Sequence, residues 1–443
     1  MVIFNPFMRQ RRDIFTGVVL GSDVVQVAVA SFETRDDPAS TLLVRGYARV
    51  PSLKIRRDEP ETTAIVVEQL ARALDEAWGE ADCEGLPGNL CLCISGGYVH
   101  REIVSSTLEL KEQRVITEED VNEVMRRICQ EEADWQPEGG KAMICGGIPL
   151  INRGFRLADG RLRLNAAGQV STSITAESFL FSEETEGHDK IDVVMREALP
   201  VDCAVDQVVY APIALSSGIF QPSVADEASG LVVDLGAGMT SYVILSHYGA
   251  VACGQIPVGM DHVVNDLGIA LGVQMETART LVKDLESLRC SLDVKQDGTA
   301  RTLTIKEHVG EQTRDLVVYA AAVEMVMEAR LREIFQLVRK TLEKEGSYLW
   351  AGNEIILTGP GAKLPQICLL AEKVFTERKV RIGTPYRARR MDGAPLGPED
   401  AIMMGLLRAS CLETQLQALE AEEAEQSGFL GKLKAFWKSV RDW

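Results

Sequence analysis

The residues best suited to chemistry lie in one stretch, Leu231 to Leu245, which reads LVVDLGAGMTSYVIL. An apolar run ends at Asp234, a turn follows with Gly236 and Gly238, and a second β-prone run starts after Thr240. Glycines let backbone amides approach phosphate oxygens closely, and a carboxylate at a strand end can hold a metal ion through water. The stretch predicts either a phosphate- and metal-binding hairpin or an ordinary hairpin with a glycine turn.

A second stretch near the N-terminus repeats this pattern. Residues 17–30 read GVVLGSDVVQVAVA and align with the first stretch without gaps. Gly21 falls under Gly236, and Val19 falls under Asp234. Two related hairpins, one opening each half of the chain, predict two lobes that close over a ligand from opposite sides.

Length and composition agree with a large globular protein. The 443 residues exceed what one core usually serves, and 46% of them are hydrophobic. The net charge of −18 argues against nucleic acid as a partner, and it restricts contact with an anionic membrane to a locally basic element. We find no secretory signal and no apolar run of about 18 residues, the length a spanning helix needs. The ten cysteines are expected to be buried free thiols.

The elements that would position the two hairpins alternate between strand and helix, which predicts an α/β protein. Expected strands are 41–50, 89–94, 207–210, 355–362 and 379–382, and expected helices are 60–80, 190–199, 214–219, 314–344, 364–375 and 398–409. Between residues 100 and 190 the pattern changes. Two strand-like pieces, 103–110 and 169–180, flank a charged segment in which Thr117 and Asp120 are helix start signals. This region predicts a separately folded α+β insertion.

Four further motifs follow one another along the chain: IPVGMDHVVND at 256–266, IILTGPGA at 355–362, VRIG at 380–383, and an expected helix at 400–407. Together with the two hairpins, they resemble the actin, Hsp70 and sugar-kinase superfamily, and within it the FtsA family of bacterial actin-like cell-division proteins. The resemblance covers nearly the whole chain. It implies an α/β, actin-like two-lobed ATPase fold with an inserted α+β subdomain and a C-terminal amphipathic helix.

The resemblance also implies a division of the chain. An N-terminal tail (1–13) precedes the first lobe, whose two parts (14–99 and 191–228) surround the inserted subdomain (100–190). The core of the second lobe has two parts (229–256 and 346–410) around an outer subdomain (257–345). An acidic linker (411–428) and a membrane-targeting helix (429–443) follow.

By the same resemblance, ATP and Mg²⁺ would occupy the cleft between the lobes. Asp234 would hold the metal. The residues that match the family at cofactor-binding positions are Gly21, Ser22, Asp234, Gly236, Gly238, Thr240, Lys283, Gly359, Gly361 and Ala362.

Other positions depart from the family pattern: Val19, Val24, Ala211, Met239, Arg279, Val282 and Pro360. The first hairpin has Val19 where the family has Asp, and Ala211 stands where a Glu precedes Pro212. Each of these losses removes a carboxylate that would position magnesium or water. Because positioning and electrostatics supply nearly all the catalysis of phosphoryl transfer, we expect a protein that does not hydrolyse ATP. Whether it binds ATP stays open.

The C-terminus changes character after an acidic stretch with five glutamates in residues 411–428. At about 100° per residue the apolar residues of 429–443 fall on one arc, which basic residues flank. A helix of this length is roughly 22 Å long, too short to span a bilayer. It would lie in the interface of an anionic membrane or pack on its own protein. The apolar residues are Phe429, Leu430, Leu433, Phe436, Trp437, Val440 and Trp443, and the basic ones are Lys432, Lys434, Lys438 and Arg441.

The resemblance implies a scaffold at the division site, on the cytoplasmic face of the bacterial inner membrane. Its partners would be the C-terminal peptide of FtsZ, further copies of itself, anionic lipid and other division proteins. On the helix expected at 314–344, the candidate residues for binding the FtsZ peptide are Arg314, Arg330 and Glu333. The alternative is that these three side chains belong to a solvated helix face. Two alternatives stay open: a PilM-like adaptor of another membrane assembly, and a two-lobed ATP-dependent kinase.

Overall fold

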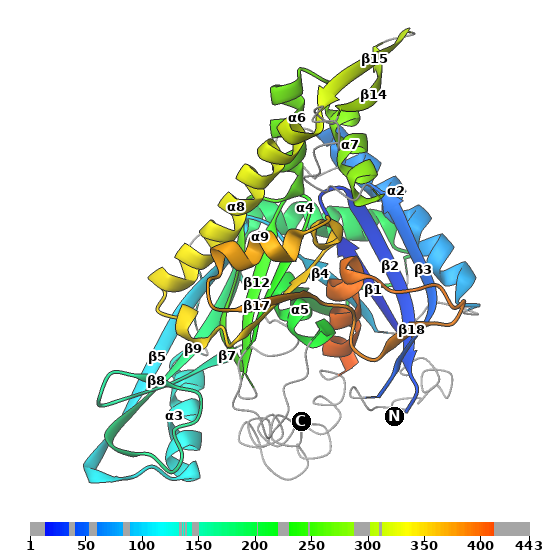
Figure 1. Cartoon of the computed structure of the whole chain (residues 1–443). Coiled ribbons are helices and arrows are strands. Elements are labelled where there is room, and N and C mark those ends of the chain that lie inside the picture. The colour runs from blue at the N-terminus through cyan, green and yellow to red at the C-terminus, as the bar shows by residue number, and fades with distance from the viewer. Residues whose placement is uncertain are drawn as a thin grey trace.

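The computed structural model describes residues 14–34, 40–52, 60–82, 89–132, 135, 137, 140–143, 150–201, 203–219, 230–246, 249–287, 302–309 and 312–411 (Figure 1). The tail expected at 1–13 lies outside the described residues. So do residues 412–443, with the helix expected at 429–443 and all of its candidate membrane residues. The described chain is an α/β protein with two large sheets and an inserted subdomain.

The first hairpin lies in a six-stranded sheet with the order β10-β4-β1-β2-β3-β18. The hairpin strands β1 and β2 are antiparallel, whereas β4, β10 and β18 join the sheet in parallel pairs. Helices α2, α4, α5 and the helix at 401–411 bury their apolar sides in the core of this sheet. The bounds are β1 (Phe15–Leu20), β2 (Val24–Phe32), β3 (Leu42–Pro51), β4 (Leu90–Ile94), β10 (Gln207–Tyr210), β18 (Ala388–Arg390), α2 (Pro60–Glu80), α4 (Thr185–Ala198) and α5 (Ala211–Ile219).

The second hairpin lies in a five-stranded sheet with the order β13-β12-β11-β16-β17. One face of this sheet packs in a second core, and the other face contributes Val232, Val243 and Ile356 to the core of the first sheet. Its strands are β11 (Gly230–Leu235), β12 (Thr240–Ser246), β13 (Gly249–Ile256), β16 (Glu354–Thr358) and β17 (Lys379–Ile382). Its helices are α6 (Met260–Leu271), α7 (Met275–Ser287), α8 (Ala320–Lys344) and α9 (Ile367–Val374), with 3₁₀ turns at Tyr348–Trp350, Pro360–Lys363 and Pro398–Asp400. Gly272, in the left-handed conformation at φ +64°, ends α6 and separates it from α7.

The inserted region has its own core around α3 (Glu118–Glu131). Its strands are β5 (Val99–Val115), β6 (Gly140–Met143), β7 (Ile151–Leu157), β8 (Leu162–Arg163) and β9 (Val170–Glu184), and the sheet order is β5-β9-β7-β8 with β6 beside β9. Thr117 caps α3 and Asp120 completes a capping box, so the expected start signals are confirmed. Figure 1 shows this subdomain projecting at the lower left.

The helix expected at 314–344 is wrong at its start. Residues 302–319 form the antiparallel hairpin of β14 (Thr302–Val309) and β15 (Gln312–Tyr319), and α8 begins only at Ala320. The side chain of Val318 is buried between the exposed Val317 and Tyr319, which is the period-2 alternation of a strand. Arg314 therefore lies on a strand, and the helical continuation after it hid the change of period.

The end of the range assigned to the second-lobe core, 346–410, packs elsewhere. Strand β18 pairs with β3 of the first sheet, and the helix at 401–411 buries Met403 and Leu407 in the first core. The apolar pattern of such a segment shows that it is buried but not against which sheet. The structure thus returns the last described part of the chain to the first lobe.

Candidate functional site

The turns of the two hairpins face a common cavity between the lobes, with a volume of about 620 Å³. The first lobe contributes Gly21 and Ser22 to its wall, and the second contributes Gly236 and Gly238. A volume between about 300 and 1,000 Å³ is typical of cofactor and small-molecule sites.

The two turns approach each other so closely that side chains larger than hydrogen would collide. A Cβ atom on Gly238 would lie 2.4 Å from Oγ of Ser22 across the cleft. The second turn also seats helix α6: the amides of Met260 and Asp261 donate to its carbonyls at 2.9 and 2.8 Å. A Cβ on Gly259 would meet the carbonyl oxygen of Ala237 at 2.4 Å. Glycine is thus required where the α6 N-terminus docks on the turn.

The structure brings together most of the sequence-predicted cofactor residues. Those that line the cavity are Gly21, Ser22, Asp234, Gly236, Gly238, Lys283 and Gly361. Three others support the wall without lining it. The buried hydroxyl of Thr240 donates to the carbonyl of Val258 at 2.7 Å, Gly359 adopts φ +80°, and Ala362 is fully buried.

Asp234 is the most perturbed carboxylate of the cleft. It is the second-last residue of β11, is only 5% exposed, and its Oδ1 accepts a hydrogen bond from Oγ1 of Thr358 at 2.9 Å. Burial raises the pKa of this carboxyl to about 6, although the Thr358 hydroxyl opposes the shift. A Cβ on Gly359 would lie 2.9 Å from Oδ1, so the backbone directly after β16 packs closely against the carboxylate.

Sequence reasoning missed a group of charged residues in the same cleft. Asp23 follows the first turn, and burial together with the nearby Asp261 raises its pKa, while Arg279 and Arg49 oppose that rise. Arg279 also pairs with Asp261 at 3.3 Å. Asp23 was predictable from the sequence because it lies next to Gly21 and Ser22 in the glycine turn. Arg49, which lies on β3, carries no local signal.

Among the described residues of the cleft, carboxylates outnumber cations. The carboxylates are Asp23, Asp234, Asp261, Glu276 and Glu399, and the cations are Arg49, Arg279 and Lys283. Within the described ranges, no group of three or more His, Cys, Asp or Glu side chains is arranged to hold a metal ion by itself. A polyphosphate entering this cleft would therefore need a cation to accompany it.

The positions expected to lack catalytic carboxylates also face the cavity. Val19 of β1 and Ala211 at the start of α5 both line it. At these places the wall is apolar, so the cleft can hold phosphates with amides and glycines but offers no carboxylate there to orient an attacking water.

The candidates for a partner peptide lie on two different elements of the outer subdomain. Arg330 of α8 pairs with Asp266 of α6 at 2.6 Å and with Glu333 at 2.7 Å. Arg314 pairs with the buried Glu307 across the β14–β15 hairpin. Both arginines therefore already have carboxylate partners, and the structure brings Arg330 and Glu333 together but places Arg314 on the hairpin.

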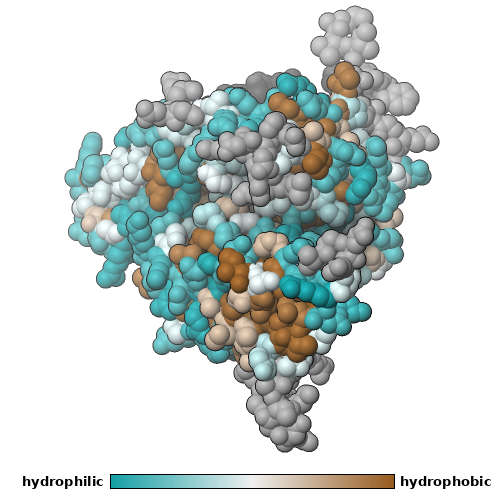
Figure 2. All heavy atoms as spheres, turned by 90° about the horizontal axis from the view of Figure 1, so that it is seen from above, coloured by the Kyte–Doolittle hydropathy of each residue, from teal (hydrophilic) through white to brown (hydrophobic). Residues whose placement is uncertain are grey.

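Exposed apolar side chains accompany these ion pairs. Ile269 on α6, Val317 and Tyr319 on β15, and Met325 on α8 are each more than half exposed. Figure 2 looks down on the side of the molecule that carries these elements and shows patches of apolar surface there. No helix among the residues placed by the structure is long and apolar enough to cross a membrane.

Comparisons with known proteins point in one direction. Residues 231–401 match the family model described as Cell division protein FtsA. The chain is 23% identical over 406 residues to that protein of Borreliella burgdorferi strain B31, covering 89% of this chain and 90% of the relative. To the protein of the same name from Bacillus subtilis strain 168 it is 22% identical over 411 residues, covering 91% and 85%. The match to the Rhizobium meliloti protein is 28% over 178 residues, 40% of this chain and 39% of that one.

Among solved structures, a chain of the PilM–PilN type IV pilus biogenesis complex is similar with a TM-score of 0.55 and 14% identity. The likeness covers 89% of this chain and 98% of that chain. At this identity it shows a shared fold, the actin-like two-lobed fold with its inserted subdomain.

Proposed function

Because the chain belongs to the FtsA family of cell-division proteins and has an actin-like fold, we propose that it is a division scaffold. It tethers FtsZ filaments to the cytoplasmic face of the inner membrane at the division site and recruits later division proteins. The observation that supports a scaffold over an enzyme is the cleft itself. Its glycine hairpins face one another, but Val19 and Ala211 stand where phosphoryl transfer needs carboxylates.

The cleft fits a nucleotide with magnesium. The glycine turns at Gly236 and Gly238 line the cavity with backbone that phosphate oxygens would approach, and Lys283 lines the same cavity. Asp234 would hold the metal through water, in keeping with the one or two carboxylates that Mg²⁺ usually takes from a protein. A bound Mg²⁺ would neutralise phosphate charge in a cleft whose carboxylates outnumber its cations. In this proposal the bound nucleotide regulates the self-association of the protein into filaments.

The peptide of FtsZ docks on the outer subdomain in this proposal. Arg330 and Glu333 lie on α8, where Arg330 also pairs with Asp266. The Arg330–Asp266 pair is bidentate and partly buried and would stay in place, whereas the exposed pair between Nη1 of Arg330 and Glu333 is worth little, so an acidic peptide would bind at Nη1. The exposed Ile269 and Met325, on the same two helices, would take apolar side chains of the peptide.

Residues 429–443 supply the membrane anchor. Their apolar arc and flanking lysines suit the interface of an anionic membrane. The test is flotation of the purified protein with anionic liposomes, comparing the full chain with a version that ends at Gly428. The full chain should float and the shortened one should stay below. Flotation of both would refute the anchor.

A second candidate function rests on the likeness to the PilM chain: an adaptor for another membrane assembly. This candidate predicts liposome binding or partner binding without any affinity for FtsZ. A sugar or acid kinase with the same cleft is the third candidate. It requires substrate-dependent consumption of ATP, which a coupled assay with purified protein measures directly.

A further inference from the structure

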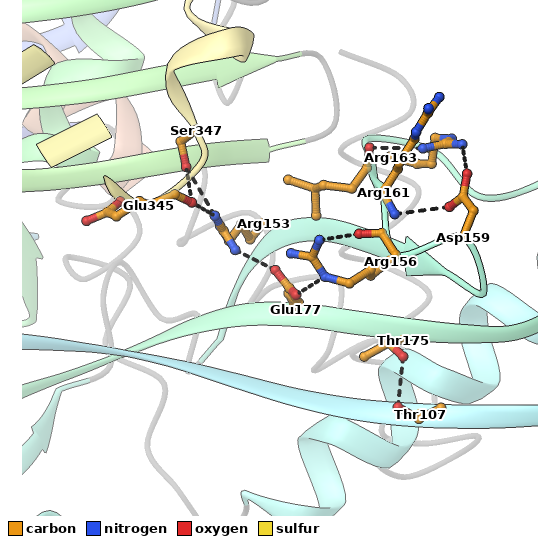
Figure 3. A network of polar contacts seen from close by, with 12 residues as sticks. Thr107, Arg153, Arg156, Asp159, Arg161, Arg163, Thr175, Glu177, Glu345 and Ser347 are labelled. Atoms are coloured by element: carbon orange, nitrogen blue, oxygen red, sulfur yellow. Dashed lines mark hydrogen bonds and ion pairs between the residues drawn. The ribbon is translucent and has the colours of Figure 1, made fainter. Parts of the chain in front are cut away.

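Arg153 of the inserted subdomain reaches across to the second lobe and is itself only 6% exposed. From β7, its Nε donates to the carbonyl oxygen of Val251 at 3.1 Å. Its Nη2 donates to the carbonyl oxygen of Glu345 at 3.2 Å and to Oγ of Ser347 at 3.1 Å. Figure 3 shows this side chain bridging from the insertion to the end of α8.

A second arginine makes a parallel connection. Arg101 of β5 donates to the carbonyl oxygen of Cys253 and to the carboxylate of Glu345, the latter at 2.5 Å. Val251 and Cys253 are two residues apart on β13, the edge strand of the second sheet. The register shift in the β12–β13 pairing makes Val251 the bulge residue of β13, and its carbonyl and that of Cys253 both accept from arginines of the insertion. The two guanidinium groups thus occupy acceptors of an open sheet edge with charge-assisted hydrogen bonds.

The local backbone aims Arg153 at the second lobe. The pairing of β7 with β9 shifts register between Asn152 and Gly154, so Arg153 is the extra residue of a bulge. Gly154 takes φ +142°, and its amide donates to Oδ1 of Asn152 at 3.1 Å. A bulge redirects the side chain it contains, and here the Arg153 guanidinium reaches both Glu177 of its own sheet and the acceptors of the second lobe.

Strand β9 connects this contact to the first lobe. Glu177, Phe179 and Phe181 alternate along it and therefore share one face. Glu177 pairs with Arg153 at 2.5 Å, and the Phe179 ring lies 5.0 and 6.0 Å from the guanidinium groups of Arg101 and Arg153. Both phenylalanines belong to the first-lobe core. One strand face thus carries a continuous set of contacts from the first lobe to the second.

We propose that Arg101 and Arg153 make the inserted subdomain a brace between the two lobes, which fixes the angle between them until the arginines release the β13 edge. The brace goes beyond the proposed function because it depends on neither nucleotide nor FtsZ. Since the cleft lies between the same two lobes, the brace limits how far the cleft opens.

Arg156 provides a matched control. It also pairs with Glu177, at 2.8 Å, but its side chain is 38% exposed, and it donates a second hydrogen bond to the carbonyl of Gly160, which lies within the insertion. Arg153→Ala removes the crossing contacts, whereas Arg156→Ala removes a contact to the same carboxylate without touching the second lobe.

The test is a pulsed electron spin resonance measurement of the distance between the lobes in the full-length protein. Spin labels are carried by genetically encoded side chains at the exposed Asp75 of α2 and Leu369 of α9, so that the native cysteines stay. The parent and Arg156→Ala should give one narrow distance distribution, and Arg153→Ala should give a broadened or shifted one. Equal narrow distributions for Arg153→Ala and Arg156→Ala would overturn the brace.

If Arg153→Ala does not fold, judged by circular dichroism, Arg101→Ala replaces it, because it removes the contacts to Cys253 and Glu345 and leaves the Arg153–Glu177 pair in place. A broadened distribution for Arg101→Ala supports the brace, and a distribution as narrow as that of the parent contradicts it.

Discussion

Asp234, the residue proposed to hold the metal ion, has a cost in stability. Its pKa of about 6 lies above the ordinary 3.8, because the folded protein buries the charge. The folded state therefore holds the proton more tightly, and stability falls as the pH rises from about 4 to about 6. Above that window the buried charge opposes folding in full.

Asp234→Asn should separate these two effects. At pH 7.5 the substitution should raise the free energy of unfolding by about 1–3 kcal/mol, since each pKa unit corresponds to about 1.4 kcal/mol. At pH 4 the gain should shrink, because Asp234 is then protonated. The same variant should bind Mg·ATP more weakly. Urea unfolding at both pH values and titration with a fluorescent nucleotide measure this, and a loss of stability at pH 7.5 would contradict the account.

The apolar wall at Val19 and Ala211 yields a prediction about turnover. The parent protein should release phosphate from ATP at the background rate. The double variant Val19→Asp, Ala211→Glu places carboxylates in the cavity and should raise phosphate release by roughly tenfold or more, because a positioned base contributes that much or above. A rate for the parent like that of actin-like ATPases would show that the departures do not remove hydrolysis.

The cleft also shows the limit of local reasoning about residues. Gly236, Gly238 and Asp234 were predictable because a strand, a glycine turn and a strand lie in one stretch of sequence. Arg49 was not, because it reaches the cavity from a strand whose sequence looks like any other. A residue that acquires its role through the fold carries no sequence signal of that role.

At the scale of elements, α8 carries the prediction about the partner peptide. Arg330→Ala should weaken binding of the FtsZ C-terminal peptide about tenfold, the usual loss for one hydrogen bond to a charged group. Arg332→Ala is the control, because Arg332 lies on the same helix, pairs with Glu328 and lines a separate hollow between α8 and α9. Fluorescence anisotropy of a labelled peptide measures both. Equal affinities for the two variants would move the peptide away from Arg330.

Elements with a strong local pattern were predictable, and their bounds agree. The helix at 60–80 and the strands at 207–210 and 379–382 have the bounds expected from the sequence. The β14–β15 hairpin was missed because a long helix follows β15 without a break, and its period dominates the window. Propensity signals a change from period 2 to period 3.6 poorly when no glycine or proline marks it.

At the scale of the whole molecule, two cores and an inserted third explain why nearly half of the residues are hydrophobic in a chain with net charge −18. The two-lobed fold was predictable because two related hairpins open the two halves. The return of β18 and the helix at 401–411 to the first lobe was not, since long-range pairing leaves no trace in the local pattern.

The brace between the lobes is likewise a property of the whole molecule. It joins β5, β7 and β9 of the insertion to β13 and the end of α8. The insertion was predictable from the sequence, but the burial of Arg153 and the reach of Arg101 to the second lobe were not. The bulge at Arg153 and the edge strand β13 account for these contacts.

The tether is the central claim, and flotation of FtsZ tests it most directly. FtsZ from the same organism is mixed with anionic liposomes and with either the full-length protein or the version that ends at Gly428. We predict that FtsZ floats with the full-length protein and stays at the bottom with the shortened one. If the full-length protein floats and FtsZ does not, the protein binds membrane but does not tether FtsZ, and the claim is contradicted.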